Sequence, residues 1–203
     1  MIPGKPSRFQ NIQLWHGENG HPWEPSSSVK QIEDVLSRGY PEVRFTRPLL
    51  AHDLHYKFDE SYSLQWLEDR YIQFIAPGSL IVGISLGGLL AAKIQELHPE
   101  LNLSIFALVA PTSSGNVKLE KPVDHRVSLY STVADEVIKG HCEDWPKFAS
   151  HSFDVPWLQH NIDLAKYACC YLISCYMRGL NMRHEVETLF PAAPPDTGEL
   201  YTV

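Results

Sequence analysis

The chain has 203 residues, of which 44% are hydrophobic and 20% charged, as is usual for a globular protein. This length supports one substantial hydrophobic core, so we expect a single domain over residues 1–190. The net charge of −7 at pH 7 argues against nucleic acid as a partner, because contact with phosphates needs a basic face.

The N-terminal residues show no apolar signal segment, and no later stretch has the length of a transmembrane helix. Three of the four cysteines, Cys169, Cys170 and Cys175, fall in one apolar segment, and the fourth is Cys142. This layout suits neither a disulfide framework nor a zinc site. We therefore expect buried thiols, no membrane span and a cytoplasmic protein.

Residues 9–15 predict the first strand, which ends in His16-Gly17. The sequence Pro-Ser-Ser-Ser at 25–28 predicts a helix N-cap, and apolar residues at helical spacing continue the helix to Gly39. A second strand is predicted at 43–47, where polar and apolar residues alternate.

His52 and His55 are three residues apart, a spacing that would suit metal ligands on a helix. No third ligand stands nearby in the sequence, so we expect no metal site there. Residues 59–75 carry aromatic and aliphatic side chains at helical spacing and predict an amphipathic helix on the sheet.

An apolar run rich in β-branched residues, 79–84, predicts a buried strand, and helix formers follow until Pro99. At the junction, residues 83–87 read Gly-Ile-Ser-Leu-Gly and match G-x-S-x-G. A tight strand-to-helix turn strains its central serine, and small residues on either side relieve the crowding. Ser85 would then project near a helix N-terminus, where backbone N–H groups favour an oxyanion.

The remaining elements follow the same alternation. Residues 103–110 predict a central strand, and 126–132 and 148–155 predict two more, the last of them weaker. A long apolar helix is predicted at 161–178. The polar stretch 111–125 predicts neither a crossover helix nor a lid, and the Pro-rich segment 191–203 predicts a disordered tail.

Strands alternating with helices predict an α/β fold, a doubly wound and mostly parallel sheet of about six strands flanked by helices. In such sheets, functional groups gather beyond the carboxyl ends of the strands.

Through its strand, G-x-S-x-G turn and helix, the chain resembles the α/β-hydrolase family over residues 9–178. The resemblance implies a small, lidless fold and a serine nucleophile followed in the chain by an acid and then a histidine. Family members commonly end the first central strand in His-Gly, followed by a residue whose backbone N–H lines the oxyanion hole. The resemblance therefore implies oxyanion contacts from the N–H groups of Glu18 and Leu86.

The acid is expected just after a strand. Asp135 lies three residues beyond the strand predicted to end at Thr132, and Glu136 is the adjacent competitor. An N-cap role for Asp135 is compatible with the catalytic one.

The histidine is expected between the last strand and the last helix. The histidines after Asp135 are His141, His151, His160 and His184. His160 lies in the predicted strand-to-helix loop, and His184 lies beyond the predicted final helix. His151 falls within the predicted strand and remains the alternative base, because strand boundaries read from sequence carry an error of a few residues.

Together these residues predict a serine hydrolase for small-molecule carboxylic esters, with Ser85 as nucleophile, His160 as base and Asp135 as orienting acid. The chemistry needs no metal or organic cofactor. A thioesterase or amidase with the same triad, or an inert scaffold that kept the fold, stays open. The sequence indicates neither the acyl length nor the oligomeric state.

Overall fold

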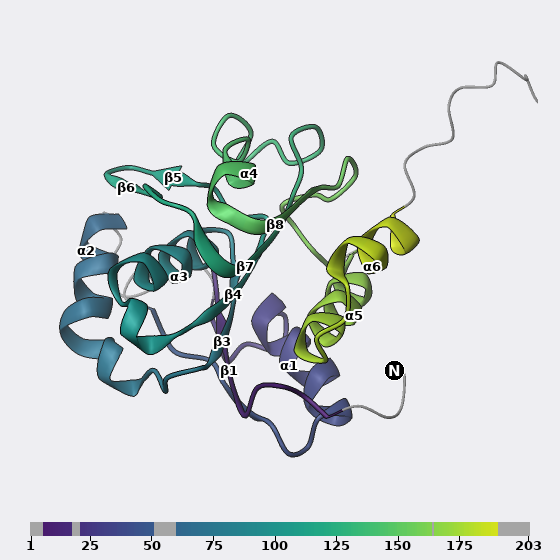
Figure 1. Ribbon diagram of the computed structural model, residues 1–203, viewed down its shortest axis with the longest axis horizontal. Coiled ribbons are helices and arrows are strands. Elements are labelled where there is room, and N and C mark those ends of the chain that lie inside the picture. The colour runs from purple at the N-terminus through teal and green to yellow at the C-terminus, as the bar shows by residue number, and fades with distance from the viewer. Residues whose placement is uncertain (1–5, 18–20, 51–59, 164, 191–203) are drawn as a thin grey trace, which may run out of the picture.

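The computed structural model describes residues 6–17, 21–50, 60–163 and 165–190. Six parallel strands form a sheet in the order β2-β1-β3-β4-β7-β8 (Figure 1), which confirms the predicted sheet. They are β1 (Asn11–Trp15), β2 (Arg44–Thr46), β3 (Leu80–Ile84), β4 (Ser104–Leu108), β7 (Val123–Tyr130) and β8 (Ala149–Asp154). Glu18, His52, His55 and the segment 191–203 lie outside the described residues.

Helices cover both faces of the sheet (Figure 1). One face carries α1 (Ser28–Gly39), α5 (Lys166–Met177) and α6 (Met182–Leu189), and the other carries α2 (Glu60–Trp66), α3 (Leu86–Leu97) and α4 (Trp145–Phe148). Side chains alternate between the faces along each strand. On β3, for example, Leu80 and Val82 join the core beneath α1 and α5, while Ile81 joins the core beneath α3.

The helix predicted at 59–75 is not a regular α-helix. After α2 the chain makes a π-helical turn, Leu67–Tyr71, and a 3-10 turn, Ile72–Phe74. Tyr71 packs edge-on against Trp15 and its hydroxyl donates to the side chain of Gln13, 3.3 Å away. Packing on β1 accompanies this local geometry, which hydrophobic periodicity did not predict.

The segment 111–125 forms a hairpin where we expected no element. The strands are β5 (Ser113–Ser114) and β6 (Val117–Lys118), antiparallel to each other. Gly115, with φ +52°, begins the two-residue loop Gly-Asn, a recognised hairpin signal. Val117 and Leu119 are buried in the core beneath α3, so the hairpin packs on the body in the crossover between β4 and β7.

The C-terminal prediction was wrong in two respects. The long helix begins at Lys166, because residues just after Asn161 form a turn in which the Asn161 side chain accepts the N–H of Asp163. A further helix, α6, follows the Gly179 stop at φ +70°, so His184 lies within a helix. The Asn181 side chain caps α6 by accepting two backbone N–H groups.

All four cysteines are buried and none forms a disulfide, as predicted. Within the described ranges, the structure contains no helix of the length and hydropathy required to cross a bilayer.

Candidate active site

Ser85 stands at a strained turn between β3 and α3. Its backbone has φ 52° and ψ −126°, a conformation that residues with a side chain rarely adopt. The N–H of Ser85 donates to the carbonyl of Leu108 on β4 at 2.9 Å, which ties the turn to the sheet. Strain of this kind is concentrated at functional sites in proteins.

The glycines of the motif allow α3 to lie close to the sheet. A Cβ on Gly83 would stand 2.5 Å from the Cα of Gly88, and one on Gly87 would stand 2.4 Å from the carbonyl oxygen of His16. Neither contact is possible between real atoms, so both positions require glycine.

The loop after β1 lies against this turn. A Cβ on Gly17 would stand 2.9 Å from the Cβ of Ser85. His16 is buried, and its Nε2 accepts the N–H of Leu50 at 3.2 Å. Its Nδ1 must then carry the proton and donates to the carbonyl of Gly17, 2.8 Å away. These contacts make His16 a support of the loop, with neither ring nitrogen available as a base.

His160 and Asp135 meet across the ends of two strands. The Nδ1 of His160 lies 3.0 Å from Oδ2 of Asp135, whose side chain is fully buried. The other carboxylate oxygen accepts the N–H groups of Val137 at 3.1 Å and Ile138 at 3.3 Å. The carboxylate is therefore fixed in orientation, and it also caps the turn that follows it.

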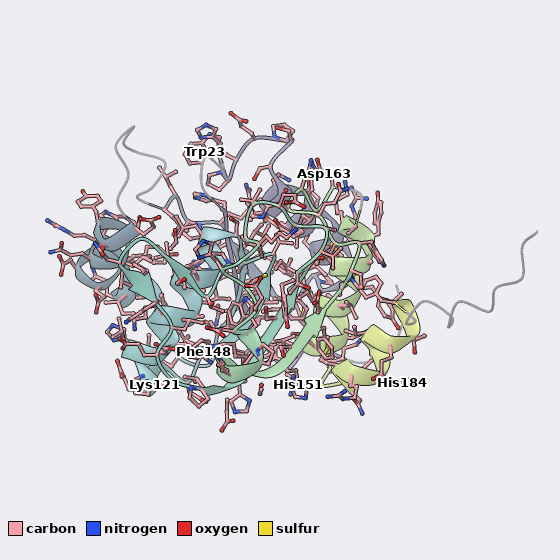
Figure 2. All side chains as sticks on the ribbon, turned by 90° about the horizontal axis from the view of Figure 1, so that it is seen from above. Trp23, Lys121, Phe148, His151, Asp163 and His184 are labelled. Atoms are coloured by element: carbon pink, nitrogen blue, oxygen red, sulfur yellow. The ribbon has the colours of Figure 1, made fainter. Side chains whose placement is uncertain are left out.

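The alternative acid, Glu136, and the alternative base, His151, make no such contact within the described part of the chain. Glu136 is exposed and pairs with Lys139 at 3.6 Å. His151 lies within β8, exposed and stacked on Phe153. Figure 2 shows His151 on the side of the molecule opposite to Trp23 and Asp163, which belong to the loops after β1 and β8.

Ser85 and His160 line one open cleft of about 460 Å³ at the carboxyl ends of the strands. Its other walls include His21, Glu24, Ser26, Ser27, Ser28 and Val137. Sequence reasoning treated the three serines only as a helix cap and did not place them in the site. Their position in the loop after the first strand was the available signal, since such loops gather at this edge.

Leu86 is the first residue of α3. The first N–H groups of a helix have no acceptor within that helix, so the Leu86 N–H is suited to an anionic oxygen beside Ser85. Among the described residues, no group of three or more His, Cys, Asp and Glu side chains could hold a metal ion.

Cys142 lies near Asp135 and is not suited to nucleophilic attack. Burial, aided by the charges of Glu143 and Asp135, raises the pKa of its thiol to about 12. The thiol thus stays protonated at neutral pH, and its sulfur contacts the carbonyl of Ser131 at 3.7 Å.

No protein-family model and no curated protein matches the sequence. Solved structures do match. An α/β hydrolase from a lagoon-sediment metagenome of Mar Chica, Morocco, has a TM-score of 0.57 and 13% identity over 86% of this chain and 93% of its own. A predicted CIB-like hydrolase from Thermoplasma acidophilum has a TM-score of 0.55 and 17% identity, over 86% and 88%.

The α/β-hydrolase domain-containing protein 10 from mouse has a TM-score of 0.56 and 11% identity, over 90% of this chain and 92% of its own. Identities this low show likeness of fold alone. The parallel sheet order and the Ser85 turn agree with that likeness. The chain therefore has the α/β-hydrolase fold that its G-x-S-x-G segment predicts.

Proposed function

We propose that the protein is a serine hydrolase that cleaves small-molecule carboxylic esters through an acyl-enzyme on Ser85. The observation that carries this proposal is the hydrogen bond between His160 and buried Asp135, in the same cleft as the strained Ser85 turn. A serine hydroxyl in the same cleft as an imidazole that is paired with a carboxylate supplies the parts of an activated nucleophile.

The contact of His160 with Asp135 supports a separate role for each ring nitrogen. Because Nδ1–H donates to the carboxylate, Nε2 is left as the basic nitrogen. In the first step Ser85 Oγ attacks the ester carbonyl while Nε2 takes its proton. The imidazolium that forms is stabilised by the adjacent Asp135 carboxylate.

The negative oxygen of the tetrahedral intermediate would be held by the backbone N–H groups of Leu86 and Glu18. Collapse of the intermediate breaks the ester bond, and His160 returns the proton to the leaving alcohol. Water then attacks the acyl-enzyme with His160 again as base, which releases the acid and restores Ser85.

Labelling with a fluorophosphonate probe tests the proposal directly, because the probe bonds covalently to an activated serine. The native protein should be labelled at Ser85, as located by peptide mass, and should hydrolyse a short nitrophenyl ester. Ser85→Ala and heat-denatured protein serve as controls and should show neither reaction. A native protein that is neither labelled nor active on esters would favour an inert scaffold.

A further inference from the structure

Three consecutive serines at the start of α1 form one wall of the cleft, called here the serine wall. Ser26, Ser27 and Ser28 line the cleft together with His21 and Glu24. Ser27 stands at the N-cap of α1 but makes no side-chain capping hydrogen bond. A hydroxyl that serves no cap and lines a cleft is available to a ligand.

Contacts outside the cleft hold this wall in place. The Gln31 side chain donates to the carbonyl of Ser26 at 3.0 Å and accepts from Lys166 of α5. Arg47 bonds both Glu33 of α1 and the carbonyl of Pro22 in the preceding loop. The wall is thereby braced by α5 and by the end of β2, so its hydroxyls need little reordering when a substrate binds.

Among the described lining residues, three aliphatic side chains supply apolar surface for an alkyl chain. They are Val29, Ile84 and Val137, of which Val29 and Ile84 are buried with 1% and 7% of their surface exposed, whereas Val137 is exposed. The described lining includes no Leu, Met, Phe, Trp or Tyr. Transfer of a methylene from water is favourable only into apolar surroundings, and covering hydroxyls without partners carries a cost.

The charged side chains of the described lining bear on the charge of the substrate. Glu24 is the carboxylate of the described lining, and no lysine or arginine occurs in that lining. A neutral substrate avoids repulsion by Glu24, whereas an anionic one would meet no fixed cation.

We propose that the cleft selects short, neutral esters that carry ether or hydroxyl oxygens, and that Ser26, Ser27 and Ser28 recognise those oxygens. The proposal rests on the proposed function of Ser85 and adds the class of substrate. Serine hydroxyls can donate to an ether oxygen and can both donate to and accept from a hydroxyl.

The test uses pairs of esters with equal numbers of heavy atoms. Nitrophenyl methoxyacetate and nitrophenyl butyrate compare the acyl side, while glycerol monoacetate and pentyl acetate compare the alcohol side. Each kcat/KM is divided by the rate constant of alkaline hydrolysis, which removes the intrinsic reactivity of the ester. At least one pair should favour the oxygen-bearing ester by about tenfold or more, as two or more hydrogen bonds would give.

The triple variant Ser26→Ala, Ser27→Ala and Ser28→Ala should reduce that preference about three- to tenfold for each lost hydrogen bond. Ser37→Ala is the matched control, because Ser37 belongs to α1 but does not line the cleft, and it should leave the preference unchanged. Fluorophosphonate labelling of Ser85 and the melting temperature are recorded for every variant.

These readouts separate the two proposals. If Ser85 is not labelled in the native protein, the proposed function fails. If Ser85 is labelled but alkyl esters are preferred in both pairs, or if the triple variant keeps the native preference, the serine wall does not select the substrate and the present inference is overturned.

Discussion

Gly17 of the loop after β1 lies directly against Ser85 of the turn after β3, so that a Cβ on Gly17 would stand 2.9 Å from the Cβ of the serine. It would also stand 3.3 Å from the carbonyl oxygen of Ile84. Two segments far apart in the sequence thus meet at the proposed nucleophile, and the space between them is smaller than one methyl group.

Gly17→Ala should therefore displace Ser85 and lower kcat for a nitrophenyl ester by about 10²-fold, the cost of misplacing a reacting group by roughly 1 Å. Gly78→Ala is the control. Gly78 has φ +73° and open space around its Cα, so alanine there should lower the melting temperature and leave kcat unchanged. Native kcat in a folded Gly17→Ala variant would show that Ser85 needs no fixed position.

Asp135 and Glu136 are adjacent carboxylates with different surroundings, which gives a matched pair of variants. Asp135→Asn keeps the shape but favours the wrong tautomer of His160, so turnover should fall by up to about 10⁴-fold. Glu136→Gln removes only an exposed pairing with Lys139 and should change turnover by less than about twofold. Equal effects of the two variants would contradict the role of Asp135.

His160 and His151 provide a second matched pair. His160→Ala should abolish turnover, and combining it with Asp135→Asn should add little, because members of one catalytic unit act non-additively. His151→Ala should keep most of its activity, since this side chain lies exposed on β8. Rates are compared at equal concentrations of folded protein. An active His160→Ala enzyme would remove the proposed base.

The buried strands were the most predictable part of the fold. Residues 80–84 and 104–108 are buried on both faces and, apart from Ser104, apolar, and such runs are typical of central parallel strands. Gly83 and Gly87 made the turn at Ser85 recognisable in the sequence. Their backbones approach other backbone atoms too closely for any side chain, so both positions need glycine.

Elements whose geometry depends on residues distant in the sequence were harder to predict. The π-helical turn ending at Tyr71 involves packing on Trp15, which is distant in the sequence. The hairpin around Gly115 is too short to show alternation, although its Gly-Asn loop was a usable signal. From the sequence, Ser26, Ser27 and Ser28 were interpreted only as a helix N-cap. The sequence does not show that the Ser27 hydroxyl makes no capping hydrogen bond.

The thiol of Cys142 gives a prediction about pH. Its pKa is raised to about 12, and those of Cys169 and Cys170 are raised to the same value by burial. A raised pKa lowers the thiolate fraction, so at pH 8 about one thiol in 10⁴ would be reactive. Iodoacetamide at pH 8 should thus leave activity and thiol count unchanged in the folded protein, while guanidinium should expose four reactive thiols. Inactivation that tracks alkylation would point to a cysteine enzyme.

The last prediction concerns Arg126, a fully buried cation on β7. It donates to the Gln95 side chain and the Ala92 carbonyl at 2.9 Å each and to the Phe148 carbonyl at 3.0 Å, and it lies 3.6 Å from Glu96. Burial lowers its pKa to about 10, which still leaves it charged at neutral pH. These contacts join α3 to β7 and to α4, so the cation links three elements on one face of the sheet.

Arg126→Met fills much of the same volume but leaves three acceptors without this donor, while Glu96 keeps Lys93 as its cation at 3.2 Å. Each buried acceptor left unsatisfied costs about 1–3 kcal/mol, so for a chain of this size the melting temperature should fall by roughly 10 °C. Hydrolysis of the nitrophenyl ester per folded molecule should stay close to that of the native protein, since Arg126 is not among the described residues that line the cleft of Ser85 and His160. Calorimetry paired with active-site titration by the fluorophosphonate measures both quantities. A melting temperature within about 1 °C of native for Arg126→Met would mean that this buried cation contributes no net stability, and that α3 is held on the sheet by its apolar contacts alone.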